Sequence, residues 1–359
     1  MLNNPSNRYA ESPMLVYWEL TRSCALACKH CRAEAIKTRH PLELTFEEAK
    51  TCIDQLTAFP QKPHIVLTGG DPLNFPDLEK IIHYINESGL TTSLAPSATH
   101  NLNIEFLQRI KDAGVKVVSL SIDGHDKKSH DGFRQVEGCF EDTMKAARML
   151  QDLEIPVQIN TLLSGETFGS LQSIYELLHQ WPNVIRWSIF FLIETGRGAK
   201  LHSISPAEAE AVMEWVYECA GKAPFDIKTT EAPHYRRVAW QKSSVGEDDG
   251  QSEMPESVKR GWGIRDGNGI MFMSHIGDVH PSGFLPVKAG NIREQSPVEI
   301  YQNSKVFKEI RDPDLYKGKC GYCQFRYLCG GSRARAYGWT GDYLASDPLC
   351  KYKPTVNVK

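Results

Sequence analysis

The first 220 residues alternate short β-rich runs with longer helical runs, and this alternation restricts the fold more than any other feature of the chain. Six runs rich in β-branched and aromatic residues predict strands at 14–20, 64–69, 90–95, 115–121, 156–163 and 184–193. Apolar residues three and four positions apart predict helices at 45–59, 77–88, 104–114, 139–153, 167–180 and 205–221. This succession predicts an α/β fold with a parallel sheet, either an open sheet or a partial barrel, that binds ligands at the carboxyl ends of its strands.

The ten cysteines of the 359-residue chain are its most informative residues. The first 13 residues contain no apolar signal segment, and the apolar run at 187–193 is too short to span a bilayer. We therefore expect a cytoplasmic protein with reduced thiols, in which clustered cysteines serve a metal or catalysis. The net charge of −3 gives no reason to expect nucleic acid or a membrane as a partner.

The chain divides into four segments by composition. An arm at 1–13 precedes the alternating region at 14–240, and a polar stretch at 241–260 reads as a linker. The remaining segment, 261–359, is expected to form a small cysteine-rich α+β extension. Within that extension the sequence predicts a β-hairpin at 269–282 and a helix at 297–312.

Cys24, Cys28 and Cys31 follow the first predicted strand within eight positions. Three thiolates from one loop can ligate three irons of a [4Fe–4S] cube and leave the fourth iron open to another molecule. A structural zinc ion would need a fourth ligand, and the usual second C-x2-C pair is absent from this region. Cys52, Cys139 and Cys219 stand alone in helical patterns, where we expect them to be buried as small apolar side chains.

The C-x3-C-x2-C motif after a first strand resembles the signature of radical S-adenosylmethionine (SAM) enzymes, and His30 fits the ring-bearing residue of that motif. The resemblance implies a partial (β/α)6 barrel whose open iron binds SAM, and a 5'-deoxyadenosyl radical that takes hydrogen from the substrate. In the family, a Gly-Gly-Glu-Pro-type motif ends the second strand and meets the SAM amino group. "GGDP" at 69–72 matches it, with aspartate in place of the more frequent glutamate.

The resemblance also implies that polar residues at the strand ends hold SAM. An arginine after the fourth strand pairs with the SAM carboxylate in relatives, as guanidinium geometry favours. The segment 194–198 is a further candidate for lining the adenosyl site. The residues expected to bind SAM are Gly69, Gly70, Asp71, Ser97, Ser121, Asp123, Arg134 and Asn160.

A second cysteine group, Cys320, Cys323, Cys329 and Cys350, lies in the last forty residues. Four thiols can close a zinc site or saturate an iron–sulfur cluster, and the spacing alone does not separate the two. C-x2-C-x5-C beyond such a barrel resembles the SPASM region or its shorter twitch relative. That resemblance implies one auxiliary [4Fe–4S] cluster, which has no open iron and therefore transfers electrons.

The stretches "GDVHPSGFLPVKAGNIRE" at 277–294 and "CGYCQFRYLCGGSRARAYGWTGDYLASDPLC" at 320–350 resemble enzymes of alternative haem and haem d1 biosynthesis, and the architecture also resembles the mycofactocin type of peptide maturase. The resemblance implies oxidative modification, by decarboxylation, of a tetrapyrrole side chain, with an electron donor such as flavodoxin or ferredoxin. Modification of a ribosomally made peptide is the alternative enzyme function, and a non-catalytic zinc scaffold is the alternative outside enzymes. Candidate groups for a carboxylated, iron-containing substrate are Arg333, Arg335, His234, Arg236, Arg237, His275 and His280.

Overall fold

The computed structural model describes residues 8–245 and 254–355, and its strands form one sheet. The sheet order is β10-β9-β8-β1-β2-β3-β4-β5-β6-β7. The strands are β1 (Leu15–Glu19), β2 (His64–Thr68), β3 (Thr91–Leu94), β4 (Val118–Ser121), β5 (Val157–Leu163), β6 (Val184–Phe191), β7 (Asp226–Thr230), β8 (Ile270–Met273), β9 (Asp278–His280) and β10 (Gly290–Asn291).

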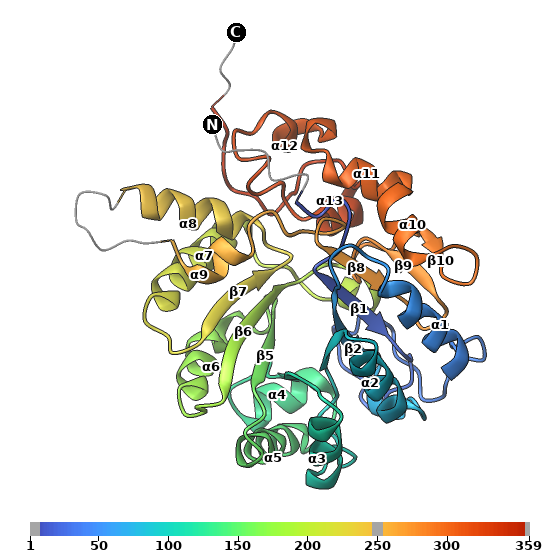
Figure 1. The fold of residues 1–359 in the computed structure, drawn as a ribbon. Helices are drawn as coiled ribbons and strands as arrows, with labels where there is room; N and C mark the ends of the chain where they lie inside the picture. Colours follow the sequence, from blue (N-terminus) through green and yellow to red (C-terminus); the bar gives the residue numbers. More distant parts are fainter. Residues whose placement is uncertain (1–7, 246–253, 356–359) are drawn as a thin grey trace.

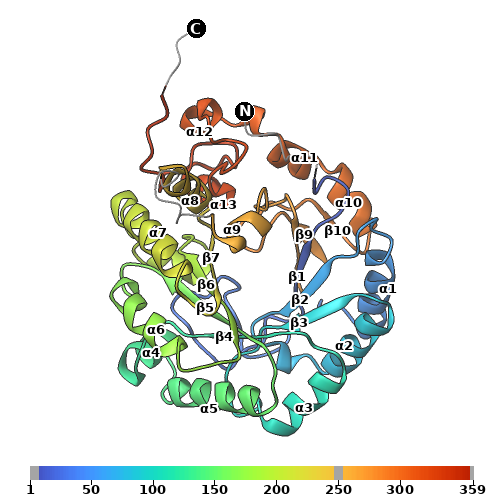
Figure 2. The ribbon, with the colours of Figure 1, turned by 60° about the vertical axis from the view of Figure 1, so that its left-hand side comes forward.

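Strands β1 to β7 are parallel neighbours in sequence order, which confirms the predicted α/β sheet, and they curve into a partial barrel (Figure 2). The six predicted strands are all present, and β7 is a seventh that the sequence pattern did not indicate. Strand β8 pairs in parallel with β1, and β8, β9 and β10 continue antiparallel from it. The C-terminal segment therefore extends the barrel sheet across the boundary expected at residue 260.

The helices form an outer layer around the strands (Figure 1). The first helix begins with a capping box, because Thr45 and Glu48 each accept a hydrogen bond from the other's backbone N–H. The helices are α1 (Phe46–Leu56), α2 (Leu78–Glu87), α3 (Ile104–Asp112), α4 (Lys127–Arg134), α5 (Cys139–Asp152), α6 (Leu171–Leu178), α7 (Pro206–Ala220), α8 (His234–Val245), α9 (Glu256–Arg260), α10 (Pro297–Asn303), α11 (Lys305–Arg311), α12 (Gly318–Tyr322) and α13 (Arg333–Thr340), with 3-10 turns η2 (Pro72–Asn74), η3 (Phe168–Ser170), η4 (Gly196–Lys200) and η6 (Pro313–Leu315).

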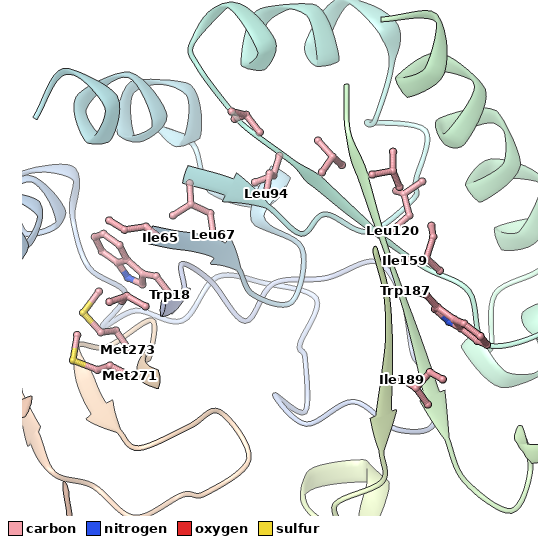
Figure 3. Close-up of a cluster of buried hydrophobic side chains, with 14 of the residues drawn as sticks. Trp18, Ile65, Leu67, Leu94, Leu120, Ile159, Trp187, Ile189, Met271 and Met273 are labelled. Atoms are coloured by element: carbon pink, nitrogen blue, oxygen red, sulfur yellow. The ribbon is translucent and has the colours of Figure 1, made fainter. Parts of the chain in front are cut away.

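Alternate residues of the strands face the helices and form the apolar core. In β1, Val16 and Trp18 have no exposed surface. Leu15 and Tyr17, which alternate with them, face the barrel interior and stay partly accessible. Figure 3 shows part of this layer, with labelled side chains from Trp18 in β1 to Met271 and Met273 in β8. Because the apolar side chains point outward, the polar strand positions are left to line the interior of the barrel.

Two predicted elements differ from the structure. The helix predicted at 297–312 is two helices, α10 and α11, because Ser304 between them has an extended ψ of 143°. The stretch 241–260, expected to be a linker, contains the end of α8 and all of α9. Residues 246–253 of that stretch lie outside the described residues.

The described part of the N-terminal arm packs on the C-terminal extension. Tyr301 donates its hydroxyl to the carbonyl of Tyr9 at 2.7 Å, and Arg311 donates to the carbonyl of Ala10 at 3.1 Å. These hydrogen bonds fix residues 9 and 10 against α10 and α11. None of the helices in residues 8–245 and 254–355 is long and apolar enough to cross a bilayer.

Candidate active site

The three N-terminal cysteines lie together at the carboxyl end of the barrel strands. Cys24 and Cys28 are buried, Cys31 is partly buried, and all three line one cavity of about 240 Å³. The loop that carries them follows β1 directly, so the sheet places it over the barrel mouth. The predicted grouping of these three thiols at the strand ends is therefore present in the structure.

The segment after β6 holds this cysteine loop in place. Arg197 donates from Nε to the carbonyl of Cys28 at 3.0 Å. Gly196 has a φ of +53°, and a Cβ atom there would lie only 2.5 Å from the carbonyl oxygen of Arg32. Residues 194–198 were expected to line the adenosyl site. Arg197 does line the cavity, but the hydrogen bonds of this segment support the cysteine loop.

Gly69 and Gly70 also line the cavity. What requires glycine at these two positions is the backbone of residues 21–23, which packs against them. A Cβ atom on Gly69 would lie 2.6 Å from the carbonyl oxygen of Thr21, and one on Gly70 would lie 2.5 Å from that of Ser23. Backbone atoms cannot give way as a flexible side chain can. The two glycines therefore allow the end of β2 to pack against the start of the cysteine loop.

Asp71 does not reach the cavity. It is 1% exposed, and its Oδ1 accepts hydrogen bonds from the backbone N–H groups of Leu73 at 3.2 Å and Ser97 at 3.3 Å. Burial raises the pKa of Asp71 to about 6, although both hydrogen bonds oppose the shift. Through this carboxyl group Asp71 joins the loops after β2 and β3, and the Ser97 hydroxyl then lies 3.6 Å from the sulfur of Cys24.

A largely buried ion pair lies beside the cysteine loop. Arg134 Nη2 lies 2.6 Å from Asp123 Oδ2, and the other carboxylate oxygen accepts from the backbone N–H of Leu162 at 2.7 Å. Burial alone would raise the pKa of Asp123, but the guanidinium of Arg134 reverses this and holds it below its usual range. Arg134 Nη1 also lies 3.7 Å from the sulfur of Cys28, and its Nε has no partner in the described residues.

Ser121 and Asn160, the remaining predicted SAM contacts, line the same cavity from β4 and β5. Asn160 Oδ1 accepts from Gln158 Nε2 at 2.8 Å, which orients the amide. Seven of the eight residues expected to bind SAM therefore lie around one cavity, and Asp71 alone stands behind it.

The cavity suits the chemistry of a metal cluster. Burial raises the pKa of Cys24 and Cys28, so these thiols need a cationic partner to be thiolates at neutral pH. His30 stacks on Phe133 with 5.0 Å between ring centroids, and burial lowers the pKa of His30 to about 4. The imidazole is therefore neutral and adds no charge beside the thiols.

His130 and Cys139 belong to this site although the sequence analysis did not place them there. His130 is fully buried, and its Nδ1 accepts from the backbone N–H of Asp123 at 3.3 Å. Its Nε2 lies 3.6 Å from the sulfur of Cys139, and both side chains line the cavity. The spacing H-x8-C, from α4 to the start of α5, was the sequence feature that could have indicated this pair. It was not recognised because α4 itself was not predicted.

The four C-terminal cysteines also come together. Cys320, Cys323, Cys329 and Cys350 line one small pocket with the buried His234. Burial raises the pKa of Cys323, Cys329 and Cys350, so this pocket also needs a cation to hold thiolates. In the described residues no three His, Cys, Asp or Glu side chains converge as the ligands of one metal ion would. The thiolates of a cube bind separate irons and need no such convergence.

Most of the residues suggested for binding a carboxylated substrate are used by the protein itself. Arg333 and Arg335 are 0% and 3% exposed, and they donate to the carbonyl of Ala345 at 2.7 Å and the carboxylate of Asp347 at 3.2 Å. Arg237 pairs with Glu210 through both carboxylate oxygens at 2.6 Å. The expectation that these three arginines face substrate is therefore wrong.

The suggested histidines are also largely occupied. His275 Nδ1 lies 2.8 Å from Glu19, which in turn pairs with Arg32 at 2.8 Å beside the first cavity. His234 lines the pocket of the four C-terminal cysteines, and its Nε2 lies 3.1 Å from Asp347 Oδ2. His280 lines neither the first cavity nor the second cysteine pocket. The roles proposed for these histidines as ligands of substrate iron therefore find no support in their positions.

Comparison with known proteins agrees with this arrangement. Residues 18–178 match the Radical SAM superfamily. The chain is 40% identical over 349 residues to an AdoMet-dependent heme synthase of Methanosarcina barkeri, covering 96% of this chain and 97% of that protein. A protein of the same name from Nitratidesulfovibrio vulgaris is 41% identical over 347 residues, covering 95% and 92%. Streptococcus suis SuiB bound to S-adenosylmethionine has a similar fold, with a TM-score of 0.71 and 15% identity over 95% of this chain and 78% of SuiB.

Proposed function

Because the chain belongs to the radical SAM superfamily and is an enzyme of that type, we propose that it oxidatively decarboxylates a propionate side chain of a haem precursor. The observation that carries the proposal is the cavity at the barrel mouth, where Cys24, Cys28 and Cys31 face the Asp123–Arg134 pair. The identity of 40–41% with two AdoMet-dependent heme synthases over nearly the whole chain supports a role in haem biosynthesis.

Cys24, Cys28 and Cys31 would hold the cube, and Gly69, Gly70, Ser97, Ser121, Asn160 and Arg134 would surround SAM. When bound, the cube and SAM supply a 5'-deoxyadenosyl radical. The residues of this chain enclose the reaction, because the apolar walls formed by Leu162, Leu192 and Phe190 limit the entry of water. Arg134 has an unpartnered Nε beside this cavity, which is available to a carboxylate such as that of SAM.

The overall change at the substrate defines what else the protein must provide. A propionate that loses one hydrogen atom and its carboxylate as CO2 becomes a vinyl group and releases one electron. We propose that the pocket of Cys320, Cys323, Cys329 and Cys350 holds an auxiliary [4Fe–4S] cluster that accepts this electron. A donor such as flavodoxin or ferredoxin would supply the electron that starts each turnover.

Anaerobic incubation with SAM, a reductant and an iron porphyrin that carries propionates tests the proposal. We expect mass spectrometry to detect 5'-deoxyadenosine together with a porphyrin that has lost CO2 and two hydrogens per modified side chain. A variant with Cys24, Cys28 and Cys31 all changed to Ala is the matched control and should form neither product. Formation of 5'-deoxyadenosine by the wild type without any change in the porphyrin would reject the proposed substrate class and favour the peptide alternative.

A further inference from the structure

A second cavity of about 340 Å³ lies beside the first, where the wall of the barrel is incomplete. Strand β7 ends the sheet on one side of this cavity, and β1 and β8 line the opposite side. Helix α9 packs against β7 and contributes Val258 and Arg260 to the lining (Figure 2). The side chain of Arg260 is 60% exposed, so this part of the lining is accessible from solvent.

The lining of this second cavity is rich in cations. It contains five basic side chains: Arg186, Lys228, Arg236, Arg260 and Arg265. Arg186 and Arg260 share the carboxylate of Asp226. Within residues 8–245 and 254–355, the other three have no ion-pair partner, so their charge is not balanced locally.

Arg265 is the clearest sign that a ligand is missing. It is 5% exposed and donates from Nε to the hydroxyl of Tyr316 at 3.0 Å, but its Nη1 and Nη2 have no hydrogen-bond partner in the described residues. Buried guanidinium nitrogens without acceptors are costly, because desolvation is not compensated. Lys228 faces the same cavity, and burial lowers its pKa to about 8, which leaves it mostly protonated at pH 7.

The acidic residues of the cavity do not neutralise these cations. Burial, followed by the proximity of Asp266, raises the pKa of Glu231 well above its usual range, which disfavours its charged form. Asp266 itself accepts hydrogen bonds at 3.1 Å from the backbone N–H groups of Arg333 and Ala334. The cavity therefore retains a net positive charge and free donors, which together fit a carboxylate.

The two cavities adjoin across one strand pair. Phe190 of β6 lines the first cavity, and Thr230, its direct partner in β7, lines the second. Neighbouring strands lie about 4.8 Å apart, so these two lining residues are close enough for one ligand larger than SAM to touch both. The ring centroids of Phe190 and Phe284 lie 6.2 Å apart, so Phe190 forms part of an aromatic pair where the two linings approach each other.

We propose that the second cavity binds a carboxylate of the substrate that is not the one being removed, through Lys228 and Arg265. A porphyrin with several propionates has its reacting side chain in the first cavity and another propionate in the second. This inference rests on the proposed function, because it takes the substrate to be a macrocycle with more than one carboxylate.

The test measures binding of an iron porphyrin with propionates to the anaerobic holoenzyme, by the change in porphyrin absorbance. We expect Lys228→Met and Arg265→Met each to weaken binding roughly 10- to 100-fold, as loss of a charge-assisted hydrogen bond does. Lys228→Arg should restore most of the affinity, since it returns the charge. Lys222→Met removes an exposed lysine at the end of α7 and should bind as the wild type does.

The fully esterified porphyrin separates charge recognition from shape. We expect the wild type and Lys228→Met to bind the ester equally weakly, because the ester offers no carboxylate to either. Unchanged affinity of both Lys228→Met and Arg265→Met for the free acid would overturn the inference while leaving the proposed function intact. Failure of the wild type to bind the free acid at all would instead overturn the proposed function.

Discussion

At the scale of single residues, the Asp123–Arg134 ion pair is expected to contribute strongly to stability at the site. The side chains of Asp123 and Arg134 are 1% and 12% exposed, and removing one partner leaves a charge that is poorly compensated. We expect Arg134→Met to lower the free energy of unfolding by about 3–5 kcal/mol. The double variant Asp123→Asn with Arg134→Met should recover part of that loss. Denaturant titration of all three proteins measures this, and a double variant less stable than Arg134→Met would contradict it.

His130 makes the stability of the fold depend on pH. Burial lowers its pKa from 6.5 to about 4, so the unfolded chain binds more protons than the folded protein between these values. The free energy of unfolding should therefore fall as the pH decreases through this window, by on the order of 3 kcal/mol in all. His130→Asn should lose this component, whereas His83→Asn, at an exposed position in α2, should keep it.

Melting temperatures measured at intervals from pH 7.5 to pH 4, under exclusion of oxygen, provide the readout for His130. Parallel curves for the wild type and His130→Asn would show that His130 does not carry the dependence. The sequence did not indicate this role, because a histidine in a short polar segment gives no sign of burial.

At the scale of elements, the packing of the β2 end against the cysteine loop is the tightest constraint. A methyl group on Gly70 would lie 2.5 Å from the carbonyl oxygen of Ser23, directly before Cys24. We expect Gly70→Ala to displace the loop and reduce bound iron by about one cube per chain, because the ligands move apart. Gly169→Ala, where the added methyl group meets nothing within 4 Å, is the matched control. Iron analysis showing equal content in both variants would contradict this.

The sequence predicted those elements that bury a periodic apolar face, and it missed those that do not. All six strands with apolar runs were found, but β7 was missed. Its Ile227 is buried, while Asp226 and Lys228 point away from the core and read as polar loop. Helix α4 was missed because only His130 and Phe133 of its eight residues are buried. In both cases tertiary contacts, rather than local pattern, hold the element.

The cysteine motif was predictable because its ligands are close in sequence. The approach of His130 and Cys139 to the same cavity was not predicted, because it depends on how the parallel strands place the segments that follow them. The sequence also suggested Arg333 and Arg335 for substrate. Their burial follows from carbonyl groups contributed by distant segments, such as Leu192 O, which accepts from Arg335 at 3.2 Å.

At the scale of the whole molecule, Arg335 joins the C-terminal extension, which carries the second cysteine group, to the lining of the first cavity. Leu192, which accepts from Arg335 in α13, also lines the first cavity. We expect Cys329→Ala to reduce the rate of formation of the decarboxylated product by a factor at least ten times larger than the factor by which it reduces the rate of 5'-deoxyadenosine formation. The reason is that, under the proposed function, the second site would accept an electron only after hydrogen abstraction. Cys219→Ala, a buried thiol in α7 outside both sites, should change neither rate.

Assays of both products in the same reaction mixture separate this role from a structural one. Equal loss of the two activities in Cys329→Ala, together with a lower melting temperature, would show that the C-terminal cysteines serve folding instead. An iron content of about eight per wild-type chain would be consistent with two cubes.

Whether SAM binds to an open iron at the N-terminal cysteine loop can be measured by magnetic resonance on the reduced, anaerobic protein with SAM that carries 17O in its carboxylate. The loop of Cys24, Cys28 and Cys31 should hold a cube whose remaining iron binds SAM, so electron–nuclear double resonance should detect coupling between the cluster and the labelled oxygen. A cluster signal without such coupling at saturating SAM, or zinc in place of iron at this loop, would contradict the account.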